Sequence, residues 1–448
     1  MESTKRFVSQ LVRFSFALIL IATAAGCGPD SGEGGGANIA AAPAPPPPPP
    51  PGSCQPSSSL SVLVTGKNVV SYVPKGNWDA RSTIAGVSLI NIEGSSITPG
   101  VIPTANAVNS CASNPASTPP MTVCTANNTD VYLIPAGSTP TVTTLTSGGT
   151  STIGFSGGDC TNCGVAMDAV HNKALVGLSV AGAPGFQFLD LGASPTFEAA
   201  IVSPAGDISE DPLIDPTHNL LLSAAESGNY EIADVTTTTA PNFFENATGG
   251  GELDSSGEDC STGIALAPAE FSDPSSIFIA DLLHATKTAG SPGTWTAPSQ
   301  NQILSESSLS AGANGVAVAQ GTHTGLVTGE FGGTNITAIA LPKTSGSGVP
   351  AVTDWVTCDI PNDPSGNPWN TGDDPHTVTA YLTPNGGHAI GLVANGGFDG
   401  PPLSFVAVVD LTKMLNTTTV PRTSGTGLGH ACATSPLPAS VVSFVAVP

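Results

Sequence analysis

Basic residues are scarce in this chain. Lys and Arg together number 11 of 448 residues, against 34 Asp and Glu, and the formal net charge is −23. A chain this acidic repels nucleic acid and anionic lipid headgroups, so we expect neither as a binding partner. The same charge favours solubility and attracts cations.

Aromatic residues and long helical patterns are scarce as well. Aromatics make up 5% of the chain and charged residues 10%, whereas there are 52 Gly and 41 Pro. No long segment places apolar residues at helical spacing. Short apolar runs bounded by Gly, Pro, Asn and Asp are typical of strands and turns. The composition therefore predicts an all-β fold.

Residues 164–191 carry the clearest pattern in the chain. An apolar run at 174–180 follows a turn signal at 168–172 (Asp-Ala-Val-His-Asn), and a second run at 186–191 follows a turn at 181–185. Asp and Asn favour tight turns because their side chains bond the nearby backbone. The stretch therefore predicts three short strands. Looser copies occupy residues 211–235, 263–282, 315–341 and 376–411, and degenerate copies occupy 69–92 and 122–134.

These copies recur about every 53 residues, close to the period of propeller blades, which have about four strands each. We expect a single β-propeller over residues 59–448 with seven blades. Six or eight stay open, because residues 276–282 could be a second or a third strand of their blade. Residues 439–448 predict a strand that pairs with the first or last blade and closes the ring. The repeats resemble those of YVTN/NHL-type propellers.

The N-terminus has the features of an export signal. Residues 1–26 begin with basic residues and continue with an apolar core at 14–23, which is too short to span a membrane. The run Ala24-Ala25-Gly26-Cys27 resembles the bacterial lipobox, although that family usually has Leu where Ala24 stands. The resemblance implies cleavage before Cys27 and its lipidation. In that family, Gly rather than Asp at position 28 implies the outer membrane, so the expected location is the bacterial cell envelope, in the outer membrane or at the cell surface. An ordinary secretory signal is the alternative.

Residues 27–58 are expected to be a disordered tether between the lipidated Cys27 and the propeller. This segment is rich in Gly and then in Pro, and residues 45–51 are consecutive prolines. Such a run adopts a stiff polyproline II helix of roughly 20 Å at ~3.1 Å per residue. The tether would hold the folded domain away from a membrane surface.

Eight cysteines remain once Cys27 is assigned to lipidation, an even number in an exported chain. Disulfides are therefore the favoured interpretation. Cys111 and Cys124 would staple one loop, and Cys54 with Cys432 would pin the two chain ends. The pair at 160 and 163 has no βαβ pattern around it, so a thioredoxin-like role is not expected. The candidates are Cys54, Cys111, Cys124, Cys160, Cys163, Cys260, Cys358 and Cys432.

Acidic residues cluster just before the first strand of several repeats, at 157–160, 207–211, 257–260 and 372–376. In a propeller these loops open at one mouth of the central channel, and Ca²⁺ takes ~6–8 oxygen ligands. The arrangement resembles the calcium-centred lactonase and gluconolactonase propellers. That resemblance implies Asp211, Asp259 and Asp374 as metal ligands and His376 as the catalytic base.

A structural interpretation of the same residues carries more weight, because Asp beside Gly is ordinary turn chemistry in an acidic chain. The histidines at 171, 218, 323 and 388 share one turn of the repeat and are interpreted as turn residues. The G-x-S-x-G string at 154–158 lacks the strand-to-helix context of a nucleophile elbow, so we interpret it as a loop.

Two functions stay open. The favoured one is a non-enzymatic binding or scaffold module, anchored to the membrane by lipid, whose partner is an unknown protein or small molecule. The alternative is a calcium-dependent hydrolase of the lactonase or esterase kind. A pyrroloquinoline-quinone dehydrogenase is disfavoured, because propellers of that kind carry tryptophan-rich repeats and this chain has 4 Trp.

Overall fold

The computed structural model describes most of the chain from residue 60 to residue 447. All described residues belong to one compact unit, residues 47–448, and the predicted signal peptide, Cys27 and the tether lie outside the described part. The described ranges are 60–65, 68–74, 85–93, 96–126, 128–136, 140–150, 153–154, 159–204, 211–224, 228–247, 253, 255–269, 276–290, 292–297, 299–303, 313–329, 334–343, 352–369, 378–395, 405–424, 428–433 and 435–447.

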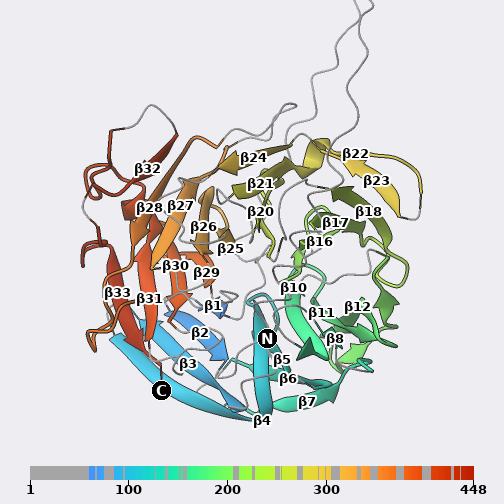
Figure 1. Cartoon of the computed structure of the whole chain (residues 1–448). Helices are drawn as coiled ribbons and strands as arrows, with labels where there is room; N and C mark the ends of the chain where they lie inside the picture. Colours follow the sequence, from blue (N-terminus) through green and yellow to red (C-terminus); the bar gives the residue numbers. More distant parts are fainter. Residues whose placement is uncertain are drawn as a thin grey trace, which may run out of the picture. The chain divides into compact units, whose positions relative to one another are not determined.

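The compact unit is a propeller-like ring of small, mostly antiparallel sheets with almost no helix (Figure 1). This confirms the predicted all-β class and the propeller-like arrangement. The first sheet contains β1 (Ser61–Thr65), β2 (Asn68–Pro74), β3 (Ala85–Glu93), β4 (Ser96–Asn114), β5 (Met121–Ala126), β6 (Asp130–Pro135) and β7 (Thr143–Thr146). A two-stranded sheet of β8 (Ile153–Gly154) and β9 (Asp159–Cys160) follows it.

The next sheets follow one another along the chain. One contains β10 (Asn162–Asp168), β11 (Lys173–Val180), β12 (Ala183–Asp190), β13 (Thr196–Phe197) and β14 (Ile201–Val202). The next contains β15 (Leu213–Asp215), β16 (Leu220–Ala224), β17 (Asn229–Asp234), β18 (Asn242–Ala247), β23 (Gly293–Thr296) and β22 (Thr286–Lys287). Then come β19 (Gly257–Asp259), β20 (Ile264–Ala269), β21 (Ser276–Asp281) and β24 (Ser299–Ile303), with the short helix η1 (Leu282–His284) after β21.

Two sheets complete the ring. The penultimate one contains β25 (Ala313–Ala319), β26 (Thr324–Gly329), β27 (Asn335–Ala340), β28 (Asp354–Asp359) and β32 (Gly429–Ala431). The last one contains β29 (Val378–Leu382), β30 (Ala389–Ala394), β31 (Phe405–Asp410) and β33 (Val442–Ala446), and the helix α2 (Leu411–Met414) follows β31.

The predicted count of seven blades is wrong: the ring resembles a propeller with five. Part of the reason lies in β4, a strand of 19 residues. Its first part pairs with β3 and its last part, from Val108, pairs with β5. Two repeats that the sequence separates are therefore joined by hydrogen bonds into one seven-stranded sheet.

Burial on both faces explains why the middle strands are continuous apolar runs. Strand β11 reads KALVGLSV, and its six central residues are buried. Clusters of apolar side chains lie between successive sheets, so each sheet is covered by a neighbour on either side. Strands of this kind need no polar face and lose the alternation expected of a half-exposed strand.

The ring closes by packing between the last and the first sheet. Leu60, Val62 and Val69 share one apolar cluster with Leu392 and Val406. The tail forms β33, which pairs antiparallel with β31, so of the two predicted pairings of the C-terminal strand, with the first or with the last blade, the second is confirmed. The first and last sheets are distinct hydrogen-bonded sheets, and side-chain packing joins them.

The repeat histidines lie in the connections between first and second strands, as predicted, but they do not all share one position. Asn172, Asn219 and His323 each have a positive φ of about 55° (55°, 55° and 54°). His171 and His218 come one residue before that position. This left-handed conformation favours Asn or Gly, and His323 takes it instead.

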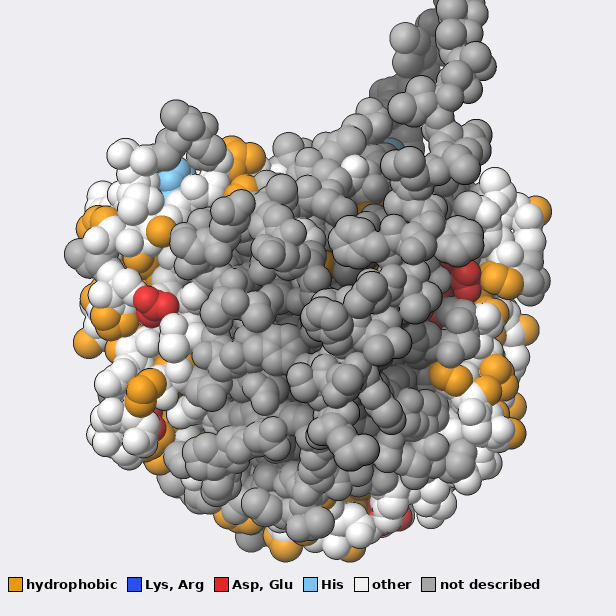
Figure 2. All heavy atoms as spheres, viewed as in Figure 1, with side chains coloured by type: hydrophobic (Ala, Val, Ile, Leu, Met, Phe, Trp, Pro, Cys, Tyr) orange, Lys and Arg blue, Asp and Glu red, His pale blue; other side chains and the backbone are white. Residues whose placement is uncertain are grey.

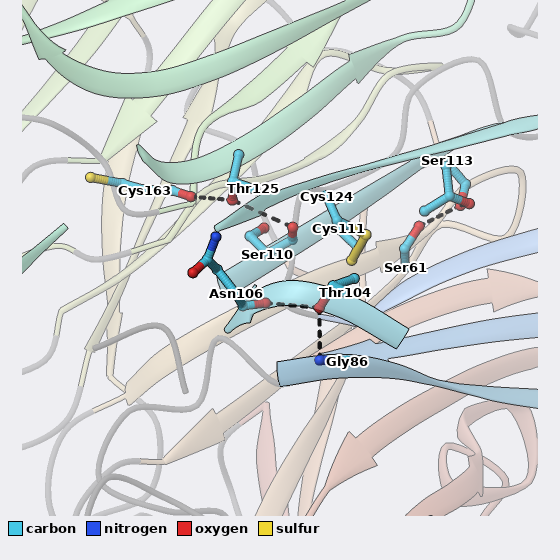
Figure 3. Close-up of a disulfide and its surroundings, with 11 residues drawn as sticks. Ser61, Gly86, Thr104, Asn106, Ser110, Cys111, Ser113, Cys124, Thr125 and Cys163 are labelled. Carbon is cyan, nitrogen blue, oxygen red and sulfur yellow. Dashed lines mark hydrogen bonds between the residues drawn. A yellow bond between two sulfur atoms is a disulfide. The ribbon is translucent and has the colours of Figure 1, made fainter. Parts of the chain in front are cut away.

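Two disulfides join described residues. Cys111 and Cys124 lie opposite each other in β4 and β5 and are bonded, which confirms that predicted pair (Figure 3). Cys432 is bonded to Cys358, so the predicted pair of Cys432 with Cys54 is wrong. The reason is topological, since β32 places Cys432 beside the end of β28. Cys163 and Cys260 each take part in a disulfide as well. Within the described part of the chain, no helix is long and apolar enough to cross a membrane.

Candidate functional site

Two of the four residues predicted for a calcium hydrolase can be placed. Asp374 and His376 lie outside the described residues. Asp211 and Asp259 are both buried, with 2% and 0% of their surface exposed. Asp259 does not belong to a loop before a first strand, as the sequence suggested, because residues 257–259 themselves form the first strand, β19.

Asp211 and Asp259 lie at opposite ends of neighbouring first strands. Asp211 forms a parallel bridge with Ser255, so these two residues are at the same level at the beginning of β15 and β19. Asp259 ends β19, four residues after Ser255, which is about 13 Å at ~3.3 Å per residue. The two candidate ligands are therefore not brought together into one coordination sphere.

Asp259 connects two sheets. Its Oδ1 atom accepts hydrogen bonds from the backbone N–H of Ser261 at 3.1 Å and from the Ser261 hydroxyl at 2.6 Å. Its Oδ2 atom lies 2.6 Å from Nδ1 of His323, which belongs to the turn before β26 in the next sheet. The carboxylate thus holds its own turn and the neighbouring sheet at the same time.

Two carboxyl groups meet between β19 and the preceding sheet. Asp215 ends β15 and Glu258 is the middle residue of β19, and both side chains are fully buried. The Asp215 carboxylate accepts the backbone N–H groups of Thr217 and His218 at 2.8 and 3.1 Å, and its Oδ2 lies 2.5 Å from His218 Nδ1. Both oxygens of the Asp215 carboxylate therefore have hydrogen-bond partners.

Burial raises the pKa of Glu258 well above its usual range. The negative charge of Asp215, a hydrogen bond with Asp215 and the charge of Asp259 raise this pKa further. Burial and the charge of Glu258 also raise the pKa of the nearby Tyr230 hydroxyl. The raised pKa favours the protonated form of Glu258, which can donate a hydrogen bond to Asp215.

The donor atoms near Glu258 do not form a good metal site. Atoms of Asp215, Glu258 and Cys260 lie within 4.8 Å of one another. However, the Cys260 sulfur is in a disulfide, and a thiolate is the form that binds metals. Both Asp215 oxygens already accept hydrogen bonds. Ca²⁺ needs ~6–8 oxygen ligands, and this group offers far fewer.

Glu258 also takes part in the contact with the following sheet through its backbone. Gln320, in the turn after β25, donates its side-chain N–H to the Glu258 carbonyl at 2.5 Å and accepts the Cys260 N–H at 3.2 Å. A comparable polar contact joins β4 to β10, where the Asn109 side chain donates to the Asn162 carbonyl at 2.8 Å. Polar side chains from the turn after β25 and from β4 thus hold neighbouring sheets together.

The Asp259 carboxylate contacts both a serine and a histidine, but these three residues do not form a hydrolytic triad. A triad needs the serine hydroxyl on one imidazole nitrogen and the carboxylate on the other. Here the Ser261 hydroxyl donates directly to Asp259, on the oxygen that His323 does not contact. The G-x-S-x-G string is flanked by the strands β8 and β9, and β10 follows, so the described residues provide no helix for a nucleophile elbow.

Sequence reasoning missed Asp215 and Glu258 as interacting residues. The repeat places Asp215 in a turn signal, Asp-Pro-Thr-His. A role in the turn is enough to explain an Asp at this position, so the sequence indicates no further contact. The acidic run at 257–260 predicts a loop that includes Glu258, whereas the structure places Glu258 in β19. The signal that could have identified it is the alignment of residues 257–259 with 213–215, which would have placed Glu258 inside a buried strand.

The visible described surface carries mainly apolar and uncharged polar side chains. Figure 2 shows isolated Asp and Glu side chains at the rim and no cluster of Lys or Arg on the part that it describes. Among the described residues, the most exposed large apolar side chains are Val101, Val170, Val202 and Leu428, each about half exposed. They come from four different regions of the chain.

Comparisons with known proteins find similarity at the level of structure. No protein-family model matches the chain, and no curated protein matches it. A solved structure of a functionally unknown protein from Desulfotomaculum acetoxidans is similar, with 12% identity and a TM-score of 0.45 over 75% of this chain and 92% of the other. We draw no functional conclusion from it.

Proposed function

We propose that the chain is an exported, lipid-anchored β-propeller that acts as a binding or scaffold module in the bacterial cell envelope. The observation that carries this proposal is the separation of the two candidate ligands Asp211 and Asp259. They lie about 13 Å apart along the first strands. Asp259 serves the contact between two sheets. A scaffold needs such contacts and no catalytic constellation.

The disulfides support the export part of the proposal. Cys111–Cys124 and Cys358–Cys432 are both formed, and disulfides persist in oxidising compartments outside the cytosol. The net charge of −23 favours a cationic or neutral partner and disfavours nucleic acid. The partner is a protein or a small molecule bound at the propeller surface.

A thermal melt with EDTA and then with millimolar Ca²⁺ tests the choice between scaffold and calcium hydrolase. A ligand that binds only the folded state, at ~100 times its dissociation constant, adds ~2.7 kcal/mol. The scaffold proposal expects no Ca²⁺-dependent shift in the mature chain. A clear upward shift that is lost in both Asp211→Asn and Asp374→Asn, and kept in the exposed control Asp190→Asn, would replace it with the hydrolase.

The lipid anchor is tested separately. We expect the full chain, produced in a bacterium, to partition with membranes and to incorporate a labelled fatty acid. Cys27→Ser should abolish both while leaving the melting temperature of the propeller unchanged. Unlabelled, fully soluble wild-type protein would show that residues 1–26 are an ordinary secretory signal.

A further inference from the structure

The connection between β29 and β30 is a tight, exposed turn that contains an Asn-Gly dipeptide. The Gly386 N–H donates to the Thr383 carbonyl at 2.7 Å, and the Thr383 N–H donates to the His388 carbonyl at 2.9 Å. Asn385, Gly386 and Gly387 are exposed, and no atom lies within 4 Å of a Cβ built on Gly386. Water therefore reaches both the Asn385 side chain and the peptide nitrogen that follows it.

Two donors hold the side-chain oxygen of Asn385. The Thr383 hydroxyl donates to Oδ1 at 2.6 Å, and the Gly387 N–H donates to it at 3.2 Å. The Thr383 hydroxyl in turn accepts the N–H groups of Gly387 and His388 at 3.2 and 3.1 Å, which polarises it. Two donors on one carbonyl oxygen stabilise the negative charge that develops there when a nucleophile attacks the carbonyl carbon. The turn therefore activates the amide carbon of Asn385.

We propose that Asn385 is a self-modification site, at which the Gly386 nitrogen attacks the side-chain amide and Asn385 becomes aspartate or isoaspartate. The Gly386 N–H first leaves the Thr383 carbonyl and loses its proton to water or hydroxide. The nitrogen then forms a bond to Cγ of Asn385, and the bond from Cγ to Nδ2 breaks. The amide nitrogen takes a proton from water and leaves as ammonia, so that a cyclic succinimide remains.

Water completes the reaction by opening the succinimide. Cleavage of the new bond between the Gly386 nitrogen and Cγ restores the main chain and leaves aspartate, whereas cleavage at the main-chain carbonyl leaves isoaspartate. The net reaction consumes water and releases ammonia, and no oxidant or reductant takes part. Either product places a carboxylate in the turn that carries His388, whose Nδ1 lies 2.8 Å from Oδ2 of Asp410. The modification therefore adds a negative charge to this turn.

Two other asparagines separate the two features that meet at Asn385. Asn314 is also followed by a Gly, but it lies inside β25, where pairing with β26 on either side of it restricts the main chain. Asn416 is exposed, and its Oδ1 accepts the Thr418 N–H at 2.9 Å and the Thr418 hydroxyl at 2.7 Å. However, the branched side chain of Thr417 follows it and hinders the approach of that nitrogen. Asn385 combines an unhindered nitrogen with two donors.

Peptide mass mapping of the folded chain, kept in mildly alkaline buffer over a time course, tests the proposal. We expect Asn385 to convert roughly tenfold faster than Asn314, or more, because two donors worth about fivefold each act together. Asn416 should also convert more slowly than Asn385. Chromatography separates the aspartate and isoaspartate products, and far-UV circular dichroism shows that the chain is folded. In urea, where both Asn-Gly pairs are unfolded, the rates at Asn385 and Asn314 should converge.

Two variants test the two features separately. Thr383→Val keeps the branched shape and removes the hydroxyl, so conversion at Asn385 should slow about fivefold, the value of one hydrogen bond. Thr418→Val is the matched control and should leave the rate at Asn385 unchanged. Gly386→Ala shields the attacking nitrogen and keeps Thr383, and it should slow conversion by more than that factor.

Three results would overturn the proposal. One is a rate at Asn385 that is no higher than the rate at Asn314 in the folded wild-type chain. Another is an unchanged or faster rate in Thr383→Val, which would mean that the contacts of the turn protect the amide. The third is an unchanged rate in Gly386→Ala, because the Gly386 nitrogen would then not be the nucleophile. The first result is read on the wild-type chain, so a variant that fails to fold does not prevent the decision.

Discussion

The Nδ1 atom of His323 lies 2.6 Å from the Oδ2 atom of Asp259, although the two residues are 64 positions apart and belong to different sheets. His323 reaches across because it occupies the left-handed turn position that Asn172 and Asn219 take in earlier repeats. His171 and His218, one residue earlier, instead contact the Asp of their own turn. A shift of one residue therefore converts a local turn contact into a contact between sheets.

Replacing His323 by Ala should destabilise the ring. The buried Asp259 carboxylate would lose a charge-assisted hydrogen bond, which is worth ~1.5–3 kcal/mol, and the partial exposure of His323 places the loss near the lower value. Urea unfolding measures it. His171→Ala is the matched control, since that side chain is 46% exposed and contacts only its own turn, so its loss should be smaller. Equal losses would mean that the contact between sheets adds nothing.

Gly263 occupies the same left-handed position in its own turn, with φ +67°. Gly263→Ala should lower the free energy of unfolding by about 2 kcal/mol or more, because Ala is strained at positive φ and its Cβ would clash with Leu283. Gly386→Ala is the control. Gly386 has φ +70° and no atom within 4 Å of an added Cβ, so only the conformational cost of ~1 kcal/mol applies. The difference between the two variants, measured by denaturant unfolding, gives the cost of the clash.

Local patterns in the sequence predicted local structure well. The turn at 168–172 and the run at 174–180 correspond to the turn before β11 and to β11 itself, because Asp, Asn and a Val-rich run determine them within a few residues. The Cys111–Cys124 pair could be predicted for the same reason, because the two residues are 13 positions apart on adjacent strands.

Long-range relationships were not predictable in this way. Cys358 and Cys432 are 74 positions apart and meet only because β32 leaves the last sheet and pairs with β28. The first two repeats form one sheet because β4 is continuous. No residue of β4 indicates this continuity in the sequence. The burial of Glu258 follows from the position of β19 between two neighbours, and the motif Gly-Glu-Asp alone indicates an exposed turn.

Loss of the Cys111–Cys124 disulfide should lower the stability of the ring and leave the local structure around the pair in place. Closing a loop of about this length stabilises a fold by ~3 kcal/mol in the chain-entropy model. We therefore expect Cys111→Ser/Cys124→Ser to fold and to melt at a lower temperature. Several backbone and side-chain hydrogen bonds around the pair, including that from the Thr125 hydroxyl to the Cys163 carbonyl at 2.6 Å, remain in place (Figure 3). An unchanged melting temperature would show that the loop is already constrained in the unfolded chain.

Glu258 should make the stability of the ring depend on pH. Burial and the neighbouring carboxylates raise its pKa above the unfolded value of 4.5, so the folded chain holds one proton more than the unfolded chain between these two values. The stability from this group is therefore complete below about pH 4.5 and is lost as the pH rises towards the folded pKa, by up to ~1.4 kcal/mol per pH unit.

Glu258→Gln removes this titration while keeping a side chain that can donate to Asp215. The variant should resemble the wild type in acid and become progressively more stable than it as the pH rises, which urea unfolding at a series of pH values measures. Glu245→Gln, in β18 of the sheet that contains Asp215, is the matched control and should follow the wild-type pH profile. Parallel profiles for Glu258→Gln and wild type would mean that Glu258 is ionised in the folded ring, and that its contact with Asp215 is not held by a shared proton.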